Sequence, residues 1–303
     1  MSVTTSDPKS MKGSAPVARS STKFSWAWLG VAPFFLFALL FLFLPSLSIF
    51  IRSFQGENNT FTFANIISLV TERDIINAYK TSLSISFITS VGGAIFGFLL
   101  AYAVILGGLP KAIRTFMVTF SGVASNFAGV PLAFAFIATM GNAGLVTRWL
   151  ETGLGIDVHA RGFTIYTIWG LSIVYMYFQF PLMVLIMAPA LDGLRREWQE
   201  ACENLGGNSF HYWRYIAFPI LLPTLLGTTI LLFGNAFGAY ATAYAFSGSF
   251  INLVPILIGA QIQGDVLYNP GLGNALALGM IVIMSLVMFG YVYMQRRSAR
   301  WLR

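Results

Sequence analysis

The sequence predicts an all-α integral membrane protein that crosses the bilayer six times, with both termini in the cytoplasm. Hydrophobic residues make up 56% of the chain and charged residues only 10%, whereas a soluble domain carries about 25% charged residues. Six apolar runs are each near the ~20 residues that cross ~30 Å of hydrocarbon as a helix. Lys and Arg gather between alternate runs, which is the pattern that orients a membrane protein.

The spans must be helical, because lipid offers no partner for a free backbone N–H or C=O group. Prolines inside the runs are tolerated where neighbouring helices satisfy the freed carbonyls. We place the six spans at 26–52, 80–106, 114–141, 163–190, 220–246 and 274–295.

The chain begins with a polar segment, residues 1–24, which is rich in Ser, Thr and Lys and has no apolar periodicity. This composition predicts a disordered cytoplasmic arm, followed by a transmembrane domain over 25–303. A signal peptide is the alternative. The apolar run from Trp26 to Phe50 is too long for one, and no small-residue cleavage site follows it, so we expect a retained first span.

Orientation follows from the basic residues between the spans. With the N-terminus inside, thirteen Lys and Arg fall on the cytoplasmic side and five outside, while the acids divide as five and six. The net charge of +7 is therefore a topology signal, and nucleic-acid binding is not needed to explain it. The outer basic residues are Arg52, Arg73, Lys80, Arg148 and Arg161.

Enzyme chemistry is not visible in the sequence. The single cysteine, Cys202, excludes an intramolecular disulfide. With His159 and His211 it is too few for a zinc site of Cys and His alone. There is no phosphate-binding loop, no His-Glu-x-x-His pair and no nucleophile with a base. We expect no catalytic residue, no metal site and no cofactor on this chain.

The central parts of the predicted spans contain no Asp, Glu, Lys or Arg. Ion-coupled carriers usually bury such a group, so its absence argues against a secondary carrier. It does not exclude one, since carbonyls and hydroxyls can hold sodium. Uncharged polar groups are present, and we predict that they line a polar path: Asn126, Tyr175, Gln179, Asn235, Tyr240 and Tyr244. The alternative for each of them is hydrogen bonding between helices.

One cytoplasmic loop, 191–219, has a distinctive pattern that predicts two short helices. Trp198, Ala201 and Leu205 recur at helical spacing and share a face. Gly206-Gly207 supplies a left-handed helix stop. Asn208 or Ser209 caps a second helix, whose apolar face is Phe210, Trp213 and Ala217. The loop either docks a partner or lies at the lipid interface with its tryptophans as anchors.

This loop resembles the EAA loop of type I ATP-binding-cassette (ABC) importer permeases. The family pattern is Glu-Ala-Ala, three residues, Gly, nine residues, Ile, one residue, Leu, Pro. The chain matches every spacing, with Cys202 in place of the second Ala and Phe218 in place of Leu; the matching positions are Glu200, Ala201, Cys202, Gly206, Ile216 and Pro219. The similarity covers about residues 79–295.

The resemblance implies a type I ABC importer permease fold in the bacterial inner membrane. The loop would form a coupling helix that docks on a cytoplasmic ATPase dimer, where ATP and Mg²⁺ bind. Glu200 would pair with a basic group of the ATPase, Ala201 would allow close approach and Gly206 would set the turn. The other implied partners are a second permease subunit, expected to be a different chain, and an extracytoplasmic solute-binding protein. A stand-alone carrier or a membrane scaffold is the alternative from another class.

A finer resemblance concerns the cargo. Gly141-Asn142-Ala143-Gly144-Leu145-Val146 is similar to the Leu-Gly-x-x-Gly-Leu element of the spermidine and putrescine permeases, a subgroup related to ferric, sulfate and phosphonate permeases. Aromatic residues facing a polar path would suit an amine through cation–π contacts. The missing carboxylate counts against a polycation. A polyamine or another small polar solute is therefore the expected cargo.

Overall fold

The computed structural model describes residues 27–56, 60–155, 164–248, 250–264 and 268–299. The predicted arm, residues 1–24, lies outside the described residues. The chain divides into two compact units, residues 1–47 and 48–303. In the described part of the chain, the secondary structure is helical apart from one isolated bridge between Gln55 and Phe61.

The first unit is an apolar helix. It consists of α1 (Ala27–Ala38), the π-helical turn η1 (Leu39–Phe43) and the start of α2 (Leu44–Arg52), which runs on into the second unit. In η1 the N–H of Leu44 bonds to the carbonyl of Leu39, one residue further back than in an α-helix. Phe34 and Phe43 are each 67% exposed, as expected for a helix whose solvent is lipid.

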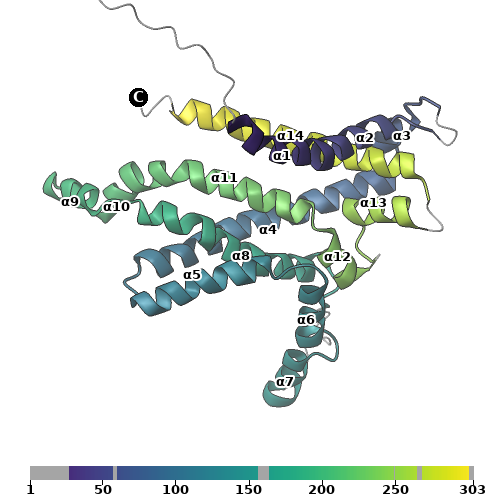
Figure 1. Ribbon diagram of the computed structural model, residues 1–303. Coiled ribbons are helices and arrows are strands. Elements are labelled where there is room, and N and C mark those ends of the chain that lie inside the picture. The colour runs from purple at the N-terminus through teal and green to yellow at the C-terminus, as the bar shows by residue number, and fades with distance from the viewer. Residues whose placement is uncertain (1–26, 57–59, 156–163, 249, 265–267, 300–303) are drawn as a thin grey trace, which may run out of the picture. The chain divides into compact units, whose positions relative to one another are not determined.

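The second unit is built on a bundle of four helices: α4 (Arg73–Leu106), α5 (Lys111–Asn126), α8 (Ile168–Asp192) and α11 (Phe218–Phe237) (Figure 1). Helices α4 and α8 approach closely because α4 carries glycine where they meet. A Cβ on Gly97 would lie 2.6 Å from the Cβ of Met183, a distance that no packed core permits. Small residues allow the same close approach between helices in other membrane proteins.

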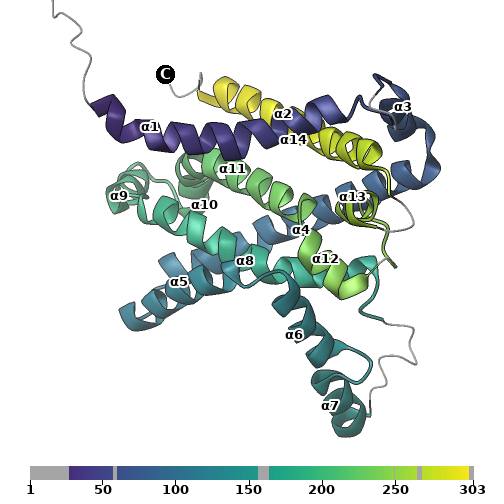
Figure 2. The same cartoon turned by 45° about the vertical axis from the view of Figure 1, so that its right-hand side comes forward.

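The remaining helices lie at the two ends of this bundle or along it. At one end are α9 (Arg196–Asn204), α10 (Ser209–Tyr212), the π-helical turn η2 (Trp213–Ala217) and the C-terminal end of α14 (Pro270–Ala299), as both views show (Figures 1 and 2). The other end carries the rest. These are α3 (Ala64–Thr71), α6 (Val130–Met140), α7 (Leu145–Leu154), α12 (Tyr240–Ser247) and α13 (Val254–Gln263).

Six helices of the described chain are long and apolar enough to cross a membrane, which agrees with the predicted number. They are Gly30–Arg52, Arg73–Leu106, Val130–Leu154, Ile168–Asp192, Ser209–Phe237 and Pro270–Arg296. The first, second, fourth and sixth overlap the predicted spans closely. The predicted third and fifth spans, 114–141 and 220–246, are wrong in their bounds, because the structure interrupts both.

Two helix breaks account for this difference. Helix α5 ends at Asn126 and α6 begins at Val130, since Gly129 adopts a φ of +77° that few other residues tolerate. Likewise α11 ends at Phe237 and α12 begins at Tyr240, inside the predicted fifth span, 220–246. One backbone group at each break has a side-chain partner on another helix, as a membrane interior favours.

The two breaks are fixed by two hydrogen bonds. The N–H of Gly129 donates to the hydroxyl of Thr242 at 2.8 Å, which joins the first break to α12. The hydroxyl of Tyr175 donates to the carbonyl of Ala239 at 2.9 Å, which joins α8 to the second break. Helices α6 and α12 also pack against each other. The C-terminal ends of α5 and α11 and the N-terminal half of α8 are therefore held as one assembly.

Candidate functional site

The loop between α8 and α11 folds as its sequence predicts up to the glycine turn. Helix α9 ends in the hydrogen-bond pattern of a Schellman motif: the N–H of Gly207 donates to the carbonyl of Cys202 at 2.9 Å, and the N–H of Gly206 donates to that of Glu203 at 2.9 Å. Gly206 has a φ of +79°, so the predicted left-handed helix stop is present. This turn reverses the chain between α9 and α10.

The second helix of the loop is capped by Asn208, one of the two predicted caps. Its side-chain oxygen accepts a hydrogen bond from the N–H of His211 at 3.0 Å, and the two residues form a capping box. Helix α10 then continues through η2 into α11 without a loop, and residues Ser209–Phe237 form one uninterrupted helix. Asn208 therefore sets the start of a helix that runs through the membrane.

The predicted apolar face of this second helix is only partly correct. Ala217 is fully buried, and Trp213 packs edge-on against Tyr102 of α4 with 5.3 Å between the ring centres. Phe210, in contrast, is 67% exposed. Phe210 is thus an apolar side chain on the outside of the loop.

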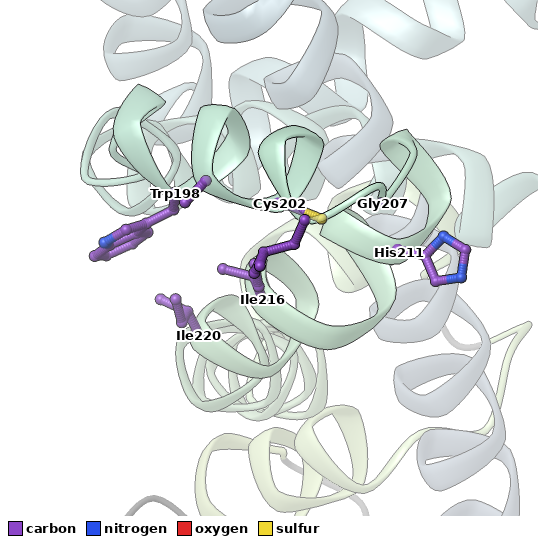
Figure 3. Close-up of a pocket in the computed structure, with 8 residues that line it drawn as sticks. Trp198, Cys202, Gly207, His211, Ile216 and Ile220 are labelled. Carbon is purple, nitrogen blue, oxygen red and sulfur yellow. The ribbon is translucent and has the colours of Figure 1, made fainter.

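The two helices of the loop enclose an open apolar groove of 380 Å³ (Figure 3). It runs from Trp198 at one end to His211 at the other. Cys202 packs tightly at the turn, since a Cβ on Gly207 would lie 2.5 Å from its sulfur. Leu205 is 90% exposed. The groove is lined by Trp198, Ala201, Cys202, Leu205, Gly207, His211, Ile216 and Ile220.

Glu200 lies on the exposed side of α9. Its only ion pair in the described chain is with Arg196, with 3.4 Å between Arg196 Nε and Glu200 Oε1. The Glu200 side chain is 60% exposed and the Arg196 side chain 89%. Such an exposed pair is worth about 1 kcal/mol or less, so it does not prevent Glu200 from exchanging its partner. Ala201 is exposed beside it. Ile216 lies in the groove, and Pro219 is half-buried in the first turn of α11.

The six polar residues predicted to line a path separate into two groups. Tyr175 is 2% exposed and Gln179 is fully buried. Tyr175 bonds to Ala239, and the Gln179 amide donates to the hydroxyl of Thr89 on α4 at 3.1 Å. In this structure both residues join helices inside the subunit, as the alternative explanation describes, and neither lines an open surface.

The other four, in contrast, lie on the surface of the subunit at or near the helix breaks. Asn126 is the last residue of α5, and its amide donates to the carbonyl of Gly122 at 2.8 Å. Asn235 is exposed two residues before the end of α11. Tyr240 and Tyr244 are 37% and 53% exposed and stack with 5.5 Å between ring centres. Uncharged polar groups thus gather where the two breaks meet.

Most of the chain matches a known protein family. Residues 93–303, more than half of the chain, match the family of binding-protein-dependent transport system inner membrane components. This chain belongs to that family. As a family member with six membrane-span candidates, it is a multi-pass inner membrane protein. The predicted polyamine subgroup is not supported, because the relatives are sulfate and ferric transport permeases.

The relatives are permease proteins. A probable sulfate transport system permease, cysT, of Nephroselmis olivacea is 26% identical over 264 residues, 85% of this chain and 86% of that protein. The sulfate permease CysT of Escherichia coli is 23% identical over 270 residues, 88% of this chain and 91% of that protein. A putative ferric transport system permease, FbpB 1, of Haemophilus influenzae is 25% identical over 265 residues, but this chain spans only 40% of it.

Solved structures share the fold. A chain of a bacterial ABC transporter that imports the acidic polysaccharide alginate matches with a TM-score of 0.71 at 16% identity, over 89% of this chain and 95% of that one. The MetNI methionine ABC transporter, in an inward-facing conformation, matches with a TM-score of 0.55 at 16% identity, over 74% of this chain and 95% of that one. The all-α membrane fold predicted from the sequence is therefore confirmed.

Proposed function

We propose that this chain is the permease subunit of an ABC importer and that, with a second permease subunit, it forms the substrate path across the inner membrane. The observation that carries this proposal is the loop between α8 and α11. In it, α9 ends in the turn at Gly206, and α10 continues directly into a membrane-spanning helix. Family membership supports the same conclusion.

In this proposal the loop docks on a cytoplasmic ATPase dimer, which binds ATP and Mg²⁺, while this chain itself catalyses nothing. The exposed carboxylate of Glu200 offers a charge to a basic group of the ATPase. Leu205, at 90% exposure, and Phe210, at 67%, offer apolar area that water solvates poorly. An exposed apolar tip with a charge beside it is a typical docking surface.

Co-purification of the ATPase tests this docking. Leu205→Asp should lose the ATPase, whereas Phe250→Asp should retain it. The two residues are matched, because both are 90% exposed, but Phe250 lies between α12 and α13 at the opposite end of the bundle. Retention of the ATPase by the Leu205 variant, or equal loss from both, would show that the loop is not the docking surface.

We also propose that the end of the bundle with α9 and α10 faces the cytoplasm, together with both termini. This end carries Lys111, Arg114, Arg195, Arg196, Arg214 and Arg296, in keeping with the positive-inside rule. Single cysteines at 206 and 153, in a Cys202→Ala background, test it. A membrane-impermeant thiol reagent applied to intact spheroplasts should label position 153 and leave 206 unlabelled; the reverse would overturn the orientation. Asp265, which lies in the predicted outer segment before the sixth span, falls outside the described residues.

For the substrate path we propose the exposed polar surface at the helix breaks, formed by Asn126, Asn235, Tyr240 and Tyr244. Lipid does not solvate exposed amides, so this surface is expected to face water or the second subunit. Tyr175 and Gln179 would support it from inside, by holding the breaks and the α4–α8 contact.

The cargo is proposed to be a small polar or charged solute. The element at Gly141–Val146 forms the turn after α6 and the first two residues of α7, and it resembles the corresponding element of polyamine permeases. The relatives named above are instead sulfate and ferric transport permeases. Binding of sulfate, ferric ion and spermidine to the partner solute-binding protein, measured by calorimetry, distinguishes the three. Binding of spermidine alone would favour the polyamine; binding of sulfate or ferric ion alone would reject it.

A further inference from the structure

A groove of 510 Å³ lies between α5 and α8 at the end of the bundle that carries the α9–α10 loop. Its lining residues belong neither to that loop nor to the polar surface at the helix breaks. Its walls are helical faces, because the lining residues recur at three- and four-residue spacing. Ile105 of α4 forms part of its base. The α5 wall consists of Lys111, Arg114, Thr115, Val118 and Thr119.

The polarity of this groove changes along its length. Lys111 is the first residue of α5 and Asp192 is the last residue of α8, so both charges lie at its mouth. Further along the same faces, toward the middle of the bundle, the walls are Val118 and Leu185. The mouth is therefore charged and the interior apolar, in the direction in which the helices run through the membrane.

The charge at the mouth is not balanced. One guanidinium nitrogen of Arg114 contacts both carboxylate oxygens of Asp192, which neutralises that pair. Lys111 makes no ion pair within the described residues. One positive charge is thus left over, on a side chain exposed at the helix start. A lysine ammonium is a common partner of phosphate oxygens.

The hydroxyl groups beside Lys111 are also available. In the spans, threonines such as Thr139 and Thr228 donate their hydroxyl hydrogen to a carbonyl one turn earlier in the same helix. Thr115 makes no hydrogen bond within the described chain, although it lies in a helix with the same carbonyls nearby. It therefore supplies a free donor one turn from the free ammonium of Lys111.

The apolar part of the groove is open as well. Leu185 of α8 is 37% exposed, and Val118 of α5, which lines the same groove, is half-buried. A free phosphate ion would use the mouth alone and leave the apolar interior unexplained. An amphipathic molecule with an anionic headgroup and a hydrocarbon chain matches both parts. Basic pockets between membrane helices on the cytoplasmic side bind such headgroups in other proteins.

We propose that this groove binds one anionic phospholipid of the inner leaflet. Lys111 and Thr115 hold its phosphate, and one acyl chain lies against Val118 and Leu185. The Arg114–Asp192 pair bounds the headgroup and sets the net charge of the mouth. The proposal rests on the orientation proposed above but not on the coupling role of the loop, so its test does not depend on ATP hydrolysis.

The test is lipid retention by the purified complex with its second permease and ATPase, measured by native mass spectrometry after exchange into phosphatidylglycerol or phosphatidylcholine. The wild type should retain phosphatidylglycerol selectively. Lys111→Gln should lower that retention about fivefold, the factor expected for one basic residue near an anionic lipid surface. Asp192→Asn frees Arg114 and should raise retention by a similar factor.

Two controls make the result decisive. Arg148→Gln removes one positive charge from α7, at the opposite end of the bundle, and should leave retention unchanged. Inorganic phosphate should not compete with the lipid. The proposal fails if Lys111→Gln and Arg148→Gln have equal effects, if both groove variants change retention in the same direction, or if phosphate alone displaces the lipid. It also fails if the second permease covers the groove, because the complex then retains no lipid there.

Discussion

Gly206 allows the coupling role of the loop to be tested through backbone conformation alone. Its φ of +79° lies in the left-handed region, where a residue with a Cβ costs about 1–2 kcal/mol and a β-branched one is a genuine outlier. No atom lies within 4 Å of a Cβ built on Gly206, so a substitution there meets no steric clash. A penalty of this size changes the population of the native turn by a factor of roughly 5–30.

Gly206→Val should therefore lower the ATPase stimulation of the assembled complex by roughly that factor, 5–30. Gly206→Asn is the matched control, because asparagine visits the left-handed region readily, and it should behave like the wild type. The assay is ATP hydrolysis in proteoliposomes with and without loaded solute-binding protein. Equal stimulation in both variants would refute the argument that this turn transmits docking; equal loss in both would show that the glycine is needed for a reason other than its φ.

Three further predictions follow from the same geometry. Glu200→Ala should reduce stimulated ATP hydrolysis by about 30-fold or more, since truncating one partner of a half-desolvated pair costs about 2–5 kcal/mol. Glu197→Ala, near it on α9, should be milder, and the reverse order would contradict docking through Glu200. Asn235→Leu and Tyr240→Ala should lower substrate uptake by proteoliposomes but leave co-purification of the ATPase intact, and normal uptake in both variants would make them packing residues. Tyr175→Phe should destabilise the subunit by about 0.5–1.5 kcal/mol, because it removes the hydrogen bond that the Tyr175 hydroxyl donates to the carbonyl of Ala239 at the α11–α12 break; thermal melting in detergent measures this, and an unchanged melting temperature would mean that the bond is not needed.

The number of spans could be predicted from the sequence, because a bilayer imposes both a minimum length and a helical backbone on any crossing segment. The interruptions within the third and fifth spans could not. An apolar run looks the same whether its helix is continuous or broken. The available signals were Gly129 ahead of Pro131 and a glycine at 238, but each residue is also tolerated inside a continuous membrane helix.

In the loop, prediction succeeded where the signal was local. The glycine stop at Gly206 and the cap at Asn208 depend on residues within one turn of each other, so the sequence carries the needed information. The exposure of Phe210 was missed because it depends on which residues other helices cover, for which the local sequence gives no signal. Tyr102 was missed as well, since its contact with Trp213 joins residues far apart in the chain.

The polar residues of the spans show the same limit. Gln179 and Asn235 are both amides in apolar runs, yet the first is fully buried and the second is exposed. Which face of a membrane helix meets another helix is decided by packing, here by glycines of α4 such as Gly93, whose Cβ would lie 2.6 Å from the Gln179 side-chain oxygen. Hydropathy does not distinguish a face that meets protein from one that meets lipid.

The helix from Ser209 to Phe237 also gives the loop an unequal mechanical attachment. On this side the loop joins α11 through continuous helix, which has no slack, whereas on the other side Gly193–Arg195 form a short non-helical hinge after α8. A force applied to α9 would therefore bend the hinge and turn α11 as a rigid lever. Since Trp213 bears on Tyr102, the end of α4 would be pushed at the same time. Stiffness on one side and compliance on the other give a small displacement of the loop a defined direction.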